Sequence, residues 1–178
     1  MIAGSHVVMW IAHQPPGNDA CRFALTTRSL LIEGSSRSGD MATRYRVRAD
    51  QSGITRRARI VSRAGEHLIE RDKAGQWTLD GQDVPAVAGA VDIDLGFTPA
   101  TNTLPIRRLG LAIGEAADVT LAWFDPADRR LKPLRQRYQR LDTDHFRYGS
   151  PDHGFETDLT VDHFGAVTHY PGYWDAAG

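Results

Sequence analysis

The sequence predicts a single, mainly β domain of antiparallel strands with at most short helices. Hydrophobic and polar residues alternate with period two in several segments, and turn-forming residues interrupt these segments at short intervals. No long segment has the 3.6-residue period of an amphipathic helix. The 178 residues, 41% of them hydrophobic, are enough for one hydrophobic core. Short strands between turns are typical of a sandwich, a barrel or a strongly curved sheet.

The strands are predicted where alternation is clearest. In residues 44–48, Tyr45 and Val47 face one side and three arginines face the other. Residues 91–95 alternate in the same way, so Asp92 and Asp94 are expected on one face. Two more strands are predicted from apolar faces formed by Val119, Leu121 and Trp123, and by Phe155, Thr157, Leu159 and Val161.

Glycine, proline, asparagine and aspartate mark the turns between these strands. The turn segments are 15–18, 34–39, 51–53, 63–66, 73–75, 80–81 and 164–165. A short helix is expected over residues 104–109, because Pro105 suits the first turn of a helix.

An Arg-Tyr pair is followed twice by the pattern Asp-x-x-Gly-x-apolar-Thr. The first copy lies at 44–45 and 72–78, and the second at 137–138 and 162–168. The match suggests two similar halves, although antiparallel hairpins also produce such matches by chance.

Composition narrows the classes of function. Cys21 is the only cysteine, so neither an intrachain disulfide nor a cysteine-based zinc site is expected. The N-terminus has no basic segment followed by an apolar run, and no stretch approaches the ~20 apolar residues of a membrane span. We therefore expect a cytoplasmic protein. A net charge of −1 speaks against nucleic-acid binding. The basic segment 107–140 and the acidic segment 142–175 are expected to neutralise each other.

The most unusual segment, 91–109, combines paired aspartates, a loop rich in threonine and asparagine, and paired arginines. It reads Asp-Ile-Asp-Leu at 92–95, Thr-Pro at 98–99 and Thr-Asn-Thr-Leu-Pro-Ile-Arg-Arg-Leu at 101–109. With Gln-Arg-Tyr at 136–138, these residues resemble the signature of the putative glycolipid-binding family of bacteria. The resemblance extends over residues 10–174, with further matches at Trp10, 31–34, 44–57, 72–81 and 161–172.

Two positions depart from the family pattern. Residues 52–54 read Ser-Gly-Ile where a tryptophan is expected, and Ala100 stands where a bulky aromatic residue is usual. Because both changes remove aromatic bulk, a pocket wall or a core contact is expected to differ there.

The resemblance implies one domain, residues 1–178, in which two similar β-rich halves form a curved sheet around a core, as an open or partial barrel. The implied fold is similar, at a distance, to the open barrels of bacterial lipoprotein carriers. It also implies binding of a glycolipid or another amphipathic small molecule without catalysis, in an apolar cavity with a polar rim. The predicted ligand-binding residues are Asp92, Asp94, Thr98, Asn102, Arg107, Arg108, Gln136, Arg137 and Tyr138.

Three alternatives stay open. The same polar residues could form an ion-pair network that ties the two halves together, because buried arginines need carboxylate partners. Asp92 and Asp94 could act as general acid and base in an enzyme of glycolipid or sugar-conjugate metabolism. A filled interior would instead indicate a structural or partner-binding module. Homodimerisation through a sheet edge is a further option without support from particular residues.

No catalytic residue, cofactor or metal is predicted. A Gly-x-Ser-x-Gly motif is missing, and Cys21 has no recognisable partner and suits a core position. The histidines lack the spacing of metal ligands. The weak metal candidates are His145, His153, His163 and His169 with Asp142, Asp144 and Asp162.

Overall fold

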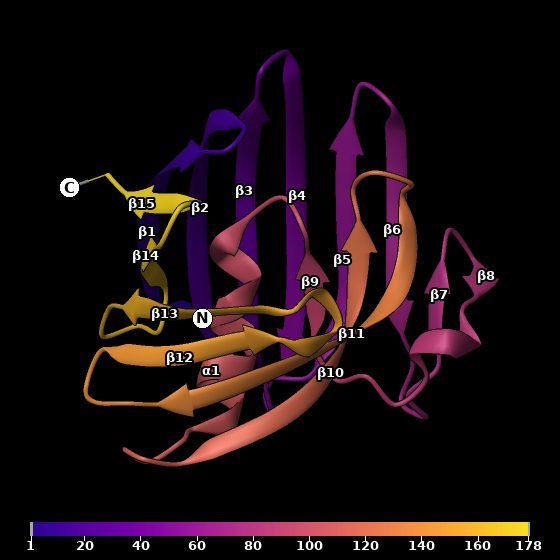
Figure 1. The fold of residues 1–178 in the computed structure, drawn as a ribbon. Helices are drawn as coiled ribbons and strands as arrows, with labels where there is room; N and C mark the ends of the chain where they lie inside the picture. Colours follow the sequence, from indigo (N-terminus) through magenta and orange to yellow (C-terminus); the bar gives the residue numbers. More distant parts are fainter. Residues whose placement is uncertain (1, 178) are drawn as a thin grey trace.

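The computed structural model describes residues 2–177, and within them the strands form one continuous curled sheet (Figure 1). The first half contains β1 (Ile2–His13), β2 (Pro16–Thr26), β3 (Ser29–Ser38), β4 (Met41–Asp50), β5 (Thr55–Ser62), β6 (Gly65–Arg71), β7 (Trp77–Leu79) and β8 (Gln82–Asp83). The second half contains β10 (Ala116–Asp125), β11 (Arg130–Arg140), β12 (His145–Ser150), β13 (Phe155–Val161), β14 (Val167–Tyr170) and β15 (Trp174–Ala176).

Antiparallel pairing runs through each half and joins the two halves. Sequential strands pair within each half, and β1 pairs with β15, where Trp10 lies opposite Ala176. The short strand β9 (Ile93–Leu95) pairs parallel to β10. The sheet is not closed, because β8 and β9 are its two ends. The predicted mainly β fold is thus confirmed as an open curved sheet rather than a closed barrel.

A linker connects the halves through the concave side of the sheet. It contains the 3₁₀ turns η1 (Pro85–Val87) and η2 (Pro99–Asn102), strand β9, and the helix α1 (Thr103–Leu109). In Figure 1 α1 lies between the two halves of the sheet. Gly110, with a φ of 55°, ends the helix in the left-handed conformation that glycine adopts without steric cost. The helix predicted over 104–109 is confirmed.

The internal repeat is also visible in the hydrogen bonds. Asp72 and Asp162 each begin the same turn, accepting a bond at Oδ1 from the backbone N–H four residues later. Gly75 and Gly165 occupy the fourth position of each turn with φ of 91° and 89°. Both turns close onto the next strand through a backbone bond between the first and fifth residues. The two similar halves predicted from the sequence are therefore present.

The linker fills the interior that was predicted to be an apolar cavity. Ile93, Leu95 and Ala100 are completely buried, and Leu104 is 1% exposed. Leu104 packs in the larger core cluster with residues of the first half, whereas Ile106 packs with the second half. Apolar burial therefore places α1 as part of the core rather than as a cover over an empty space.

The two departures from the family pattern have different surroundings. Ala100 lies within the core, while Ser52 and Gly53 border an open hollow of about 250 Å³ together with Leu104 and Arg108. The hollow lies at the position where the family pattern has a tryptophan.

The helices among the described residues are all too short and too polar to cross a lipid bilayer.

Candidate functional site

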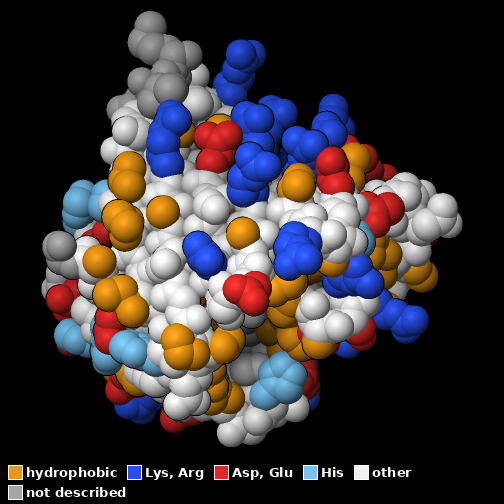
Figure 2. Space-filling model, turned by 90° about the horizontal axis from the view of Figure 1, so that it is seen from above, with side chains coloured by type: hydrophobic (Ala, Val, Ile, Leu, Met, Phe, Trp, Pro, Cys, Tyr) orange, Lys and Arg blue, Asp and Glu red, His pale blue; other side chains and the backbone are white. Residues whose placement is uncertain are grey.

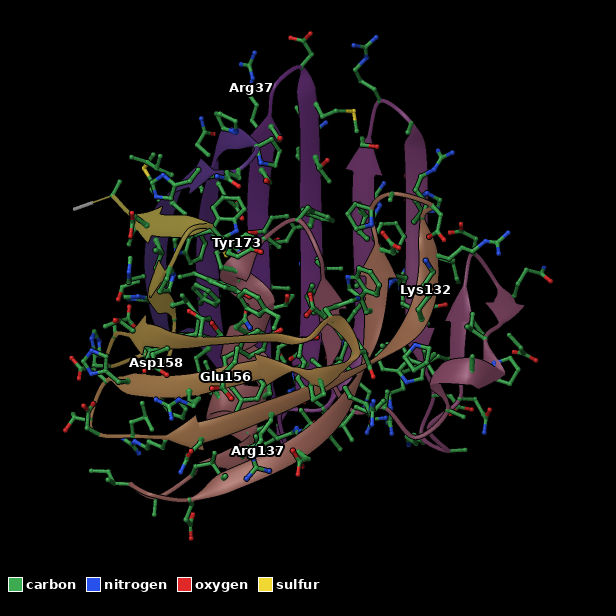
Figure 3. The ribbon with its side chains drawn as sticks, in the orientation of Figure 1. Arg37, Lys132, Arg137, Glu156, Asp158 and Tyr173 are labelled. Atoms are coloured by element: carbon green, nitrogen blue, oxygen red, sulfur yellow. The ribbon has the colours of Figure 1, made fainter. Side chains whose placement is uncertain are left out.

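A pocket of about 180 Å³ lies between the linker and the second half of the sheet. The linker contributes polar groups to it, including Asp94, Thr98 and Asn102. The second half contributes aromatic side chains: Trp123, Tyr148, Tyr170, Tyr173 and Trp174. In Figure 3 Tyr173 lies over the space between the two halves of the sheet. The pocket thus joins a few polar groups to a wall of aromatic rings.

A chain of hydrogen bonds holds the polar side of the pocket. Gln136 donates from Nε2 to Asp94 Oδ2 at 2.6 Å, and the Tyr138 hydroxyl donates to Gln136 Oε1 at 2.9 Å. Asn102 in turn donates from Nδ2 to the Tyr138 hydroxyl, also at 2.9 Å. Gln136 and Tyr138 lie two residues apart on β11. Because side chains alternate along a strand, both point inward, towards the linker.

Asp94 is the ionisable group of the pocket. Desolvation by the surrounding protein raises the pKa of its carboxyl group from 3.8 to about 6, although the hydrogen bond from Gln136 and the nearby His153 act to lower it. The residue is only half-buried by surface area, because its carboxylate faces the pocket. A carboxylate that accepts one protein hydrogen bond and borders a pocket has capacity left for hydroxyl donors of a ligand.

Asp92 has a different environment from Asp94. It is 1% exposed and forms a bidentate pair with Arg108, with Arg108 Nη2 at 2.6 Å from Oδ2 and Nε at 3.1 Å from Oδ1. Burial raises the pKa of Asp92, whereas Arg108 lowers it. The two aspartates therefore serve separate networks, which does not favour their action as a general acid–base pair.

A third buried network fixes the linker to the first half of the sheet. The hydroxyl groups of Tyr45 and Thr98 both donate to Asp19 Oδ2, the former at 2.8 Å. Thr98 also accepts a bond from the backbone N–H of Ala100 and so caps η2. Burial raises the pKa of Asp19, despite the hydrogen bonds from Thr98 and Tyr45 that lower it. Asp19 Oδ1 is buried without a hydrogen-bond partner in the described structure.

Two predicted site residues lie away from the pocket. Arg137 is exposed on the outer side of β11 (Figure 3) and pairs with Asp118 at 2.8 Å. The Arg107 guanidinium lies 4.3 Å from the ring centre of Phe164 and donates to its backbone oxygen at 2.5 Å. The structure therefore brings together Asp94, Thr98, Asn102, Gln136 and Tyr138, with Asp92 and Arg108 in a neighbouring buried pair.

Asp19 and the tyrosines around the pocket were not predicted from the sequence. Asp19 falls on the inward face of β2 with Cys21 and Phe23, so the alternation of that strand was the available signal. The Tyr170 ring contacts Tyr148 and Tyr173, with ring centres 5.9 Å and 5.1 Å apart. Tyrosine and tryptophan crowd the C-terminal sequence, but their composition does not show which rings meet.

The weak metal candidates do not assemble into one site. Asp142, Asp144 and His145 have ligand atoms within 4.8 Å of one another at the exposed turn between β11 and β12. The other histidines lie elsewhere: His153 packs on Trp123, and His169 bonds to Asp175. An exposed acidic turn of this kind is common without an ion.

Among the described residues, one ion pair shows the expected neutralisation between the basic and acidic segments: Arg135 lies 2.6 Å from Asp152. Arg147, which belongs to the acidic segment itself, lies 2.9 Å from Asp158. Both pairs are exposed on the second half of the sheet.

An open sheet of two repeated halves, curled around a buried linker and bordered by one polar and aromatic pocket, defines a single-domain β protein. The chain belongs to the family described as "Putative glycolipid-binding", whose model matches residues 7–176. It is similar to the crystal structure of a DUF1089 family protein from Pseudomonas aeruginosa, with 32% sequence identity and a TM-score of 0.74. That similarity covers 88% of this chain and 90% of the other. No curated protein matches the sequence.

Proposed function

We propose that the protein binds the sugar-bearing part of a glycolipid, without catalysis, in the pocket beside Asp94. The observation that carries the proposal is the combination of a carboxylate and an amide, from Asp94 and Asn102, with five aromatic side chains around one hollow. Sugars offer hydroxyl groups to polar acceptors and apolar C–H faces to aromatic rings, so they match such a lining. Family membership supports the same class of ligand.

The size of the pocket limits which part of a glycolipid enters. Its volume of about 180 Å³ is below the roughly 300–1,000 Å³ of pockets that enclose drug-sized ligands. The concave side of the sheet is filled by linker residues such as Leu95 and Leu104. We therefore assign a single sugar ring to the pocket and place the acyl chains outside the core.

The protonation behaviour of Asp94 supports a functional role. A carboxyl group with a raised pKa destabilises the folded state at neutral pH, because its charged form is disfavoured there. An asparagine would keep the hydrogen bond with Gln136 without the charge. A residue that lowers stability and borders a pocket is typical of a site selected for binding.

Asp94→Asn is therefore expected to raise the free energy of unfolding above about pH 6, by about 2 kcal/mol after allowance for solvent access. Between pH 3.8 and about 6 the folded wild-type protein holds more protons than the unfolded chain, so its stability falls as the pH rises through this window. The variant lacks this decline. Urea unfolding at a series of pH values measures the difference, which should shrink as the pH falls towards 3.8.

Asp118→Asn is the matched control, because Asp118 is a largely exposed carboxylate on the outer side of the sheet. A stabilisation by Asp94→Asn that stays constant with pH would contradict the assigned cause.

Binding is tested by titrating the protein with octyl β-glucoside and octyl β-galactoside below their micelle concentrations. Trp123 and Trp174 line the pocket, so their fluorescence should change on binding. Trp10 and Trp77 are 1% exposed and lie outside the pocket, so their fluorescence should stay constant. Asp94→Ala is expected to weaken binding about 10-fold or more, since a hydrogen bond to a charged group contributes about 1.5–3 kcal/mol. Asp118→Ala should bind like the wild type.

Native mass spectrometry of protein purified from its own host provides a second measurement. A glycolipid that co-purifies with the wild type and is lost from Asp94→Ala is expected. Plain octanol binding as tightly as the glycosides, unaffected by Asp94→Ala, would overturn the proposal.

A further inference from the structure

The outer face of the first half carries a dense group of arginines, which we call the arginine face: Arg22, Arg44, Arg46, Arg48, Arg57 and Arg59. All six side chains are exposed and point away from the core, since they alternate with buried residues along β2, β4 and β5. Five of them surround an open depression of about 760 Å³, together with Leu31, Val61 and Glu66. Figure 2 shows blue side chains gathered in the upper part of the view.

The strand register places like charges directly opposite each other. Arg46 lies opposite Arg59, and Arg48 lies opposite Arg57. Directly opposed like charges destabilise an antiparallel pair, so the sheet itself gains nothing from this arrangement. An external anionic partner would remove the repulsion.

Carboxylates neutralise only part of this charge. Glu33 lies 3.2 Å from Arg46, Glu66 lies 2.6 Å from Arg59, and Glu70 lies 3.7 Å from Arg57. Among the described residues, no carboxylate oxygen lies within 4.0 Å of Arg22, Arg44 or Arg48. The face therefore keeps an excess of positive charge, although the whole chain has a net charge of −1.

Aliphatic side chains adjoin the arginine face on β1. Val7, Met9 and Ile11 point outward with exposed fractions of 63%, 55% and 51%. Val7 lies directly opposite Arg22, so the aliphatic row and the arginines share one surface. In Figure 2 hydrophobic side chains lie along the left of the view, beside the blue group.

We propose that this outer face of β1–β5 docks onto an anionic lipid surface. Guanidinium groups bind lipid phosphates, and Val7, Met9 and Ile11 enter the boundary between headgroups and acyl chains. Nucleic acid fits the face less well, because single strands are bound by aromatic side chains between the basic ones, and the exposed apolar side chains here are aliphatic. The proposal does not depend on the pocket beside Asp94.

The test measures co-flotation of the full chain with vesicles made of equal parts phosphatidylcholine and phosphatidylglycerol. Arg48→Gln with Arg57→Gln is expected to weaken the partition coefficient about 25-fold, since each basic side chain near an anionic surface contributes about fivefold. Binding of the wild type should weaken as salt is added. Because the substitution removes an opposed like-charge pair, thermal unfolding should show no loss of stability.

Arg135→Gln with Arg147→Gln is the matched control. It makes the same change of charge on exposed arginines of the second half. Its partition coefficient should differ from that of the wild type less than twofold at the same salt concentration. Met9→Ser with Ile11→Ser keeps every charge and should weaken binding at high salt, where insertion of apolar side chains is the remaining attraction.

Three results would overturn the proposal. The first is equal binding to vesicles of pure phosphatidylcholine. The second is equal loss of binding in the two double-arginine variants. The third is tighter binding to a single-stranded oligonucleotide, or to soluble glycerophosphoglycerol, than to the anionic vesicles.

Discussion

Arg108→Met is expected to lower the free energy of unfolding by about 3–5 kcal/mol, because it leaves a buried carboxylate without its partner. Asp92 is 1% exposed, and Arg108 makes a bidentate contact with it. Arg108 also packs its Cβ and Cγ atoms against Gly53, but methionine preserves most of that contact. Urea unfolding followed by far-ultraviolet circular dichroism measures the change.

The double variant Asp92→Asn with Arg108→Met separates the ion pair from packing. With both charges removed, most of the lost stability should return, since the penalty arises from the unpaired charge. Arg107→Met is the neighbouring control, because Arg107 has no carboxylate partner within 4.0 Å among residues 2–177. If Arg108→Met and the double variant are equally unstable, the ion pair is not the cause.

Trp10→Ala is expected to lower the free energy of unfolding by about 3–5 kcal/mol. Trp10 is 1% exposed on β1, and its Nε1 donates to the backbone oxygen of Val167 on β14 at 2.6 Å. It also packs edge-on against Phe23. The side chain thus joins the two halves of the sheet, and its removal leaves both a cavity and an unpaired carbonyl.

Trp10→Phe isolates part of this effect, because phenylalanine keeps an aromatic ring without the N–H donor. Its loss should be smaller, about 1–3 kcal/mol for the buried carbonyl left unsatisfied. Met9→Ala, one residue away on the exposed side of β1, should change stability by less than about 0.5 kcal/mol. A Trp10→Phe variant as stable as the wild type would argue against the hydrogen bond.

Local patterns predicted strands such as β4 and β13 because each buries one face, whereas the turn expected over 34–39 was wrong, because residues 34–38 continue β3. Tyr45 and Val47 on β4 are buried between exposed arginines, and Leu159 and Val161 are buried on β13. The pairing of β1 with β15 was not predictable, since it joins residues such as Trp10 and Ala176 through few contacts that have no local pattern. The curvature of the sheet likewise depends on how the linker packs. Many side chains from distant parts of the sequence decide that packing together, so no local pattern predicts it.

The candidate site was predictable where its residues are continuous in sequence. Asp94, Thr98 and Asn102 lie within the segment that carries the family resemblance, and all three border the pocket. Arg137 could have been set aside, because period-two alternation places it opposite to Gln136 and Tyr138. The separation of Asp92 from Asp94 was not predictable, because β9 begins only at Ile93 and Asp92 turns to Arg108.

The two ends of the open sheet affect how the protein behaves at high concentration. β8 contains two residues and β9 three, so each boundary strand offers few free backbone donors and acceptors. Long bare edges act as templates on which further chains stack into fibrils, whereas very short ones do not. The two terminal strands of this open sheet therefore add little free edge on which further copies of the chain could pair.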